Sequence, residues 1–168
     1  MINIKSLVVL LLIAGLGGCS CLKQHDKPEL LVINVLDPEL YSDCHIRGSV
    51  NMPFEKLERF AQELDRNTQI VLYCSNYKCT ASGFGAQMLK KMGFTHVWAY
   101  EAGMAGWYQQ GLPTEGPARE SYLKAANPPL PEEGTSKELV LSTSELQQKM
   151  AEIPACSCAA PCGCCCNH

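Results

Sequence analysis

The sequence predicts an α/β domain of three layers, in which helices cover both faces of a mostly parallel central sheet. Two observations support this prediction. Short apolar runs that end in polar or turn residues alternate along the chain with segments whose apolar residues recur at helical spacing. A strand such as 69–73 is apolar almost throughout, as is typical of a parallel sheet whose two faces are both buried. The chain length of 168 residues suits one such domain with appendages.

The elements can be placed in order from residue 30. Each predicted strand is an apolar run bounded by polar residues, glycine or proline, and each predicted helix has one apolar side. The longest helix begins at Thr80 and ends at Met92, because Gly93 suits the left-handed residue that follows a helix. We expect strands at 30–33, 49–52, 69–73 and 96–100, and helices at 54–64, 80–92 and 104–110.

Composition narrows the classes of function. Lys and Arg number 14 against 17 Asp and Glu, a net charge of −3, so the chain has no general basic surface for a nucleic acid. The 11 cysteines are unevenly spread, and six of them fall within residues 156–168. A disulfide framework distributes its cysteines through the domain that it stabilises, so this distribution argues against one.

Residues 1–18 predict a lipoprotein signal peptide. Lys5 precedes an apolar run over 7–16 that is too short to span a bilayer, which needs about 20 apolar residues. The sequence Leu-Gly-Gly-Cys over 16–19 resembles a bacterial lipobox, which predicts palmitate or another acyl chain on Cys19. We therefore expect a lipid-anchored protein on the periplasmic or cell-surface side of a membrane, with the outer membrane favoured in a diderm host. An ordinary signal peptide is the alternative.

The remaining chain divides by composition. A tether at 19–29 precedes the domain at 30–115, and a Pro/Gly-rich linker follows at 116–141. Ser142 and Glu145 match a capping box that opens a short helix at 142–153, which either docks on the domain or stands off it. A Cys-rich tail occupies 154–168.

Cys74 is the candidate nucleophile. It ends the predicted strand 69–73 and is followed by a short loop and a helix N-terminus. We expect the loop N–H groups and the positive end of the helix to point at its sulfur, which lowers the pKa of the thiol and favours anion binding. Ligands also bind at the carboxyl ends of strands in such sheets.

A series of separated motifs covers the domain between residues 30 and 113. They lie at 32–35, 41–53, 71–74, 80–82, 93–97, 102–107 and 111–113. In their order and spacing, these motifs resemble those of the rhodanese family of sulfurtransferases. The resemblance implies a rhodanese-like fold and an enzyme that needs no cofactor. It implies that Cys74 takes sulfane sulfur from thiosulfate or another donor, holds it as a persulfide and passes it to a thiol or cyanide acceptor.

The active-site loop that the resemblance implies departs from the family at its end. Cys79 stands where many members have Arg, which weakens recognition of a dianion, so thiosulfate:cyanide transfer does not follow from the resemblance. Two interpretations of Cys79 are open. It resolves a persulfide or sulfenate on Cys74 as a disulfide, which would also suit a thiol–disulfide redox protein, or it is a small packed residue. The loop comprises Ser75, Asn76, Tyr77, Lys78, Cys79 and Thr80.

The tail predicts a second chemistry. Its dense thiols favour Zn or Cu(I), although disulfide cross-linking and the absence of a defined role are alternatives. If the domain is a non-catalytic module, the tail is then the working part as a metal or thiol sink. No feature of the sequence identifies a protein partner. The candidate ligands are Cys156, Cys158, Cys162, Cys164, Cys165, Cys166 and His168.

Overall fold

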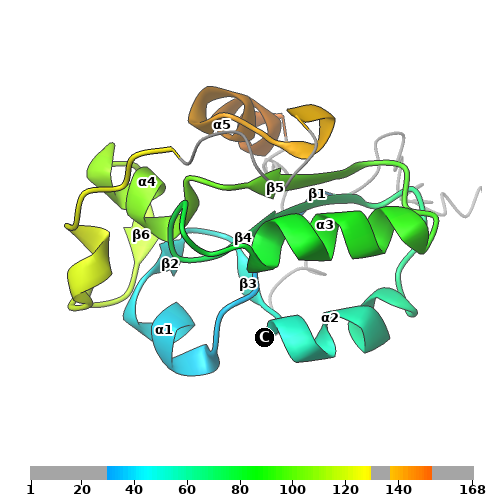
Figure 1. Cartoon of the computed structure of the whole chain (residues 1–168), viewed down its shortest axis with the longest axis horizontal. Helices are drawn as coiled ribbons and strands as arrows, with labels where there is room; N and C mark the ends of the chain where they lie inside the picture. The colour runs from blue at the N-terminus through cyan, green and yellow to red at the C-terminus, as the bar shows by residue number, and fades with distance from the viewer. Residues whose placement is uncertain (1–29, 130–136, 153–168) are drawn as a thin grey trace, which may run out of the picture.

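The fold is known from a computed structural model that describes residues 30–129 and 137–152. Within these residues a sheet of four parallel strands has the order β3-β1-β4-β5, with helices on both faces (Figure 1). The predicted three-layer α/β architecture is thus confirmed. The strands are β1 (Leu30–Asn34), β3 (Val50–Asn51), β4 (Gln69–Tyr73) and β5 (Val97–Tyr100).

Two helices cover one face of the sheet. They are α2 (Phe54–Ala61) and α3 (Ala81–Lys91), whose buried residues pack against Ile33 and Leu72. Gly93 follows α3 with a φ of 94°, which confirms the predicted helix end. Burial of this apolar side fixes both helices on the sheet.

The other face is covered by segments that come later in the chain. They are α4 (Gly103–Gln109), the 3₁₀ turn η1 (Ser121–Leu123) and α5 (Thr143–Ala151). Trp107, Leu123 and Leu146 are buried there against Val71 and Tyr73. In Figure 1, α5 and α2 lie on opposite sides of the sheet.

One short helix and one strand pair were not expected from the sequence. Asp37-Pro38 looked like a turn, but Pro38 is the first residue of α1 (Pro38–Asp43), a position that proline favours because its missing N–H has no helical partner. Strands β2 (His45–Ile46) and β6 (Thr114–Glu115) form a separate antiparallel pair. Two residues are too few to show a periodic pattern.

Much of the segment expected to be a linker, 116–141, packs on the domain instead. Leu123 is fully buried, and the Asp43 carboxylate accepts hydrogen bonds of 3.0 Å from the backbone N–H groups of Arg119 and Glu120. After the short 3₁₀ turn η2 (Lys137–Leu139), Val140 forms a parallel bridge with Ala99 on the free edge of β5. The proline-rich segment 116–141 thus has an extended backbone in its described part, and specific contacts hold it on the domain.

Of the two alternatives for the helix after the linker, the structure supports docking. The predicted capping box is present, with the side chains of Ser142 and Glu145 each bonded to the other's backbone N–H. Thr143 Oγ1 lies 2.9 Å from the Tyr100 hydroxyl oxygen, and Leu146 is fully buried. The Lys149 ammonium lies 3.7 Å from the centre of the Trp98 ring, a cation–π contact.

Several predictions concern residues outside the described ranges and stay predictions. They are the signal peptide 1–18, the acylation of Cys19, the tether 19–29 and the metal-binding tail 154–168. In residues 30–129 and 137–152, no helix is both long and apolar enough to cross a bilayer. The same residues contain no group of three or more His, Cys, Asp or Glu side chains arranged to hold a metal.

We expect the Leu146→Ala substitution to lower the free energy of unfolding by about 2–4 kcal/mol, because it leaves a cavity between α5 and the sheet. Urea unfolding followed by circular dichroism measures this loss. Gln147→Ala is the control, since Gln147 is exposed on the same helix, and it should change the value by less than about 0.5 kcal/mol. Equal stabilities of the two variants would show that α5 does not contribute to the core.

Candidate functional site

Cys74 lies at the carboxyl edge of the sheet, immediately after β4. Since β4 is between β1 and β5, this residue is surrounded by other strand ends and is fully buried. Its thiol donates a hydrogen bond to the backbone oxygen of Cys79 at a distance of 3.0 Å and lies 3.6 Å from Ser82 Oγ. The topology therefore places a nucleophilic residue where ligands bind in parallel sheets.

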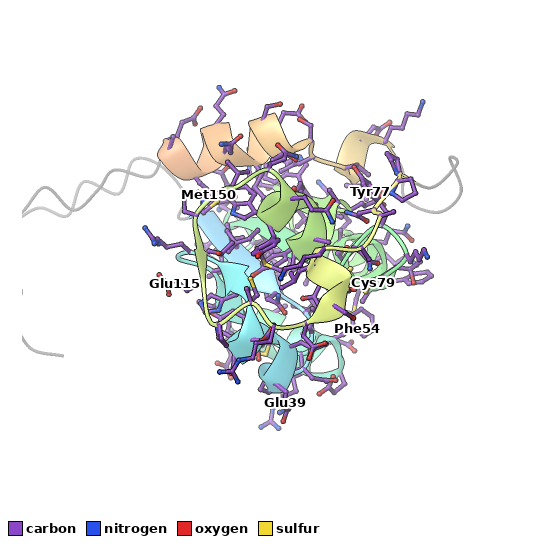
Figure 2. The ribbon with its side chains drawn as sticks, turned by 90° about the vertical axis from the view of Figure 1, so that its left-hand side faces the viewer. Glu39, Phe54, Tyr77, Cys79, Glu115 and Met150 are labelled. Atoms are coloured by element: carbon purple, nitrogen blue, oxygen red, sulfur yellow. The ribbon has the colours of Figure 1, made fainter. Side chains whose placement is uncertain are left out.

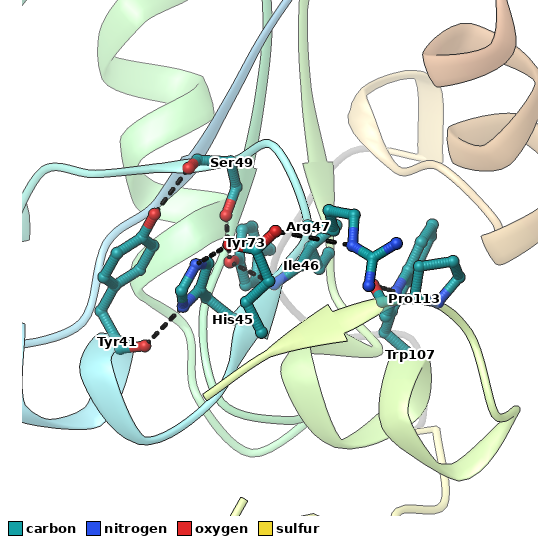
Figure 3. A network of polar contacts seen from close by, with 9 residues as sticks. Tyr41, His45, Ile46, Arg47, Ser49, Tyr73, Trp107 and Pro113 are labelled. Carbon is teal, nitrogen blue, oxygen red and sulfur yellow. Dashed lines mark hydrogen bonds and ion pairs between the residues drawn. The ribbon is translucent and has the colours of Figure 1, made fainter. Parts of the chain in front are cut away.

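Tyr73 anchors the strand end just before Cys74. Its buried hydroxyl accepts a hydrogen bond from the backbone N–H of Ile46 at 3.1 Å and lies 2.8 Å from Ser49 Oγ (Figure 3). The Tyr41 hydroxyl in turn donates to the Ser49 carbonyl, and His45 bonds the Tyr41 carbonyl through Nδ1. Burial raises the pKa of Tyr73 to about 12, so it stays a neutral structural group.

Helix α4 supports the active-site loop from the other side. The backbone N–H groups of Met104 and Ala105 donate to the carbonyls of Cys74 and Ser75, at 2.8 and 2.9 Å. This approach requires glycine at position 103. Gly103 has a φ of 61°, and a Cβ there would lie 2.7 Å from the Asn76 nitrogen, closer than real contacts allow.

Asn127 holds the outer part of the loop. Its Oδ1 accepts the backbone N–H of Tyr77 at 3.0 Å, and its Nδ2 donates to the Ala102 carbonyl at 2.9 Å. The loop is thus connected to the turn before α4 through one side chain. Sequence analysis missed Asn127, because a single Asn in a proline-rich segment carries no recognisable signal.

The loop donors do not converge on Cys74 as the sequence predicted. The N–H of Tyr77 binds Asn127, while those of Lys78 and Cys79 bind Oδ1 and the carbonyl oxygen of Asn76, each at 3.0 Å. Cys79 receives the backbone N–H groups of Ser75 and Ala81, whereas Cys74 receives that of Ser82 in the first turn of α3. The donors of the loop therefore stabilise charge at its end more than at its start.

The two thiols of the loop titrate as one coupled pair. A hydrogen bond from the Cys74 thiol is the main reason that the pKa of Cys79 is lowered, to about 6. The same hydrogen bond, together with burial and the neighbouring charge, raises the pKa of Cys74, so the expected lowering at Cys74 is wrong for this state. The two sulfurs therefore share a proton, and negative charge is favoured on Cys79 rather than on Cys74.

The residues expected in the site are brought together, apart from the tail, which lies outside the described residues. Ser75, Asn76, Tyr77, Lys78, Cys79 and Thr80 follow Cys74 in one tight loop that leads into α3. Figure 2 shows Tyr77 and Cys79 on the right-hand side of that view, away from Glu115.

Cys44, by contrast, is buried in the cluster on the opposite face of the sheet from Cys74, and burial raises the pKa of its thiol. Within the described residues, all three thiols at 44, 74 and 79 are free. Two adjacent sulfurs with different charge and exposure suit nucleophilic sulfur chemistry.

Comparison with known proteins identifies relatives over this part of the chain. Residues 20–110 match the family model of the rhodanese-like domain. The chain is 36% identical over 67 residues to the thiosulfate sulfurtransferase PspE of Escherichia coli (strain K12), a match that covers 39% of this chain and 62% of that protein. It is 33% identical over 78 residues to the putative sulfur carrier protein YrkF of Bacillus subtilis (strain 168), covering 46% and 41%.

Among solved structures, the chain is similar to the Rhodanese_3-like domain of the Alr3790 protein from Anabaena sp. The sequence identity is 32%, the TM-score is 0.46, and the match covers 51% of this chain and 98% of that one. The matches to the two curated relatives span less than two thirds of their length.

The contact between α4 and the loop can be tested with two glycine variants. Gly103 and Gly111 have similar φ angles of 61° and 67°, but nothing lies within 4 Å of a Cβ at Gly111. Both Ala substitutions should cost about 1–2 kcal/mol through backbone strain. Gly103→Ala should cost about 1–3 kcal/mol more in urea unfolding, because its Cβ overlaps the loop backbone. Equal losses would contradict this account.

The charge on Cys79 can be tested by alkylation with iodoacetamide between pH 4.5 and 9. Since only the thiolate reacts, the rate at Cys79 should rise through a midpoint near pH 6 and level off above it. In Cys74→Ala the main cause of the lowered pKa is absent, so the midpoint should move up towards about 8.5. Peptide mass spectrometry separates Cys79 from the other cysteines. An unchanged midpoint in the variant would contradict the coupling.

Proposed function

The chain belongs to the family of rhodanese-like domains, and on that premise we propose that it is a sulfurtransferase that carries sulfane sulfur on Cys74. The observation that carries the proposal is the position of Cys74, which follows the central strand β4 and precedes a tight loop and the N-terminus of α3. One relative is named a thiosulfate sulfurtransferase and another a putative sulfur carrier protein.

The reaction is a double displacement at sulfur. The Cys74 thiolate attacks the outer sulfur of the donor, so that a Cys74 persulfide forms and the rest of the donor leaves with the electron pair of the broken bond. The acceptor then removes the outer sulfur and restores the thiolate. Proton exchange with Cys79 supplies the thiolate, because the two thiols share one proton.

The charge of the loop favours a donor with a single negative charge. Lys78 is the one basic residue between Cys74 and Thr80, and it is exposed. The lowered pKa of Cys79 favours negative charge on this side chain. A dianion such as thiosulfate is therefore repelled more strongly than a monoanion. We propose that an organic thiosulfonate, or another monoanionic carrier of sulfane sulfur, is the better donor.

The proposal predicts hydrosulfide production from a donor in the presence of excess dithiol. Cys74→Ala should lower this rate by more than about 100-fold, because no persulfide can form. For the wild-type protein, kcat/KM should be roughly tenfold higher for a thiosulfonate than for thiosulfate. The thiosulfonate has one negative charge fewer, so it is repelled less by the negative charge of the loop. Both rates follow from colorimetric sulfide determination.

Cys44→Ala is the matched control, because it removes another buried thiol of the same domain at a distance from the loop. Once its activity is divided by the fraction of folded protein, Cys44→Ala should be as active as the wild-type protein. If Cys74→Ala and Cys44→Ala have the same activity with both donors, the proposed sulfurtransferase function is wrong.

A further inference from the structure

Resting on the proposed persulfide at Cys74, we propose that Cys79 is its internal acceptor: the Cys79 sulfur attacks the Cys74 sulfur, expels hydrosulfide and leaves a disulfide between the two residues. The two cysteines close one tight loop. The Cys74 thiol donates to the backbone carbonyl oxygen of Cys79, and its sulfur lies 3.0 Å from that oxygen. The Cys74 sulfur thus lies against the backbone of Cys79, and the side chain of Cys79 is the main cause of the raised pKa of Cys74.

The surrounding contacts hold this pair together. The N–H groups of Met104 and Ala105 fix the start of the loop, and the N–H of Cys79 binds the Asn76 carbonyl at 3.0 Å and fixes its end. Cys74 is fully buried, whereas Cys79 is partly exposed. Burial limits the access of an external thiol to a sulfur on Cys74, whereas Cys79 belongs to the same tight loop, with its carbonyl oxygen 3.0 Å from the Cys74 sulfur.

The atoms and electrons of the step balance. The Cys79 thiolate forms a bond to the inner sulfur of the Cys74 persulfide, and the bond between the inner and outer sulfurs breaks. The outer sulfur leaves with that electron pair and the persulfide proton as hydrosulfide, while the Cys79 sulfur is oxidised to the disulfide level. One donor molecule thus yields one desulfurated donor, one hydrosulfide and one disulfide per chain.

The alternative direction of attack is disfavoured by its leaving group. Attack on the outer sulfur would move the persulfide to Cys79 and expel the Cys74 thiolate. Cys74 is buried, and burial disfavours a thiolate at this position, so the Cys74 thiolate is a poorer leaving group than hydrosulfide.

The cycle needs an external dithiol as its reductant. The dithiol would attack the disulfide at Cys79, the partly exposed sulfur, and restore both loop thiols with two electrons and two protons. The overall reaction is then reduction of sulfane sulfur to hydrosulfide. It differs from simple transfer, in which the sulfur stays at the oxidation level of a persulfide or thiocyanate.

A single-turnover experiment without any external thiol tests the inference. The full chain is reduced, the reductant is removed, and one equivalent of benzenethiosulfonate is added. The six tail cysteines are replaced by serine in all samples, so that they cannot accept sulfur. The unchanged loop is compared with Cys79→Ser, with Cys44→Ser as the matched control. Benzenesulfinate, hydrosulfide and the state of the peptide around Cys74 are measured.

With Cys79 present, we expect hydrosulfide equal to the sulfinate released and a peptide linked between Cys74 and Cys79, and Cys44→Ser should behave in the same way. Cys79→Ser should release sulfinate more slowly, because Cys79 no longer takes the Cys74 proton, so each sample is followed until sulfinate release is complete. Per sulfinate released, it should give at least tenfold less hydrosulfide, and it should retain one extra sulfur on Cys74. Equal hydrosulfide from both loops, or a persulfide that persists on either cysteine of the unchanged loop, would refute the internal acceptor. If no sample releases sulfinate through Cys74, the proposed function itself fails and this inference with it.

Discussion

The contact between the active-site loop and the N-terminus of α4 is the constraint on which the site depends. Two backbone hydrogen bonds from α4 fix the carbonyls of Cys74 and Ser75, and they can form only because residue 103 has no Cβ. These bonds hold the start of the loop against α4, and the Cys74 sulfur lies 3.0 Å from the carbonyl oxygen of Cys79 at the end of the loop. Since β4 supplies one end of the loop and α3 the other, the same contact ties the sheet to helices on both of its faces.

Much of this fold could be predicted because its signals are local. The strand 69–73 was predicted with its observed bounds, since an apolar run between polar residues has few other interpretations. The packing of 116–141 could not be predicted in the same way. Its anchors, Leu123 and Asn127, are isolated residues in a proline-rich segment, and their contacts are with residues far away in the chain.

In the candidate site, too, some features could be predicted from the sequence and others could not. Cys74 could be located from the order of strand, loop and helix, but the charge within the loop could not. Which thiol ionises first depends on the N–H groups that reach each sulfur and on relative burial, and neither is encoded in spacing alone. Cysteine at position 79, where many family members have arginine, removes a cation from the loop, and the proposed donor selectivity and the proposed fate of the persulfide both rest on this difference.

The bridge between Val140 and Ala99 has a consequence for the limits of the domain. The match to the family model ends at residue 110, but the outer edge of β5 is covered by a segment that comes later. A chain shortened to the family boundary would present an unpaired strand edge beside an uncovered apolar face, which is the usual starting point for edge-to-edge association and aggregation. The unit in which this edge and this apolar face are both covered therefore extends beyond the family match, through the end of α5 at Ala151.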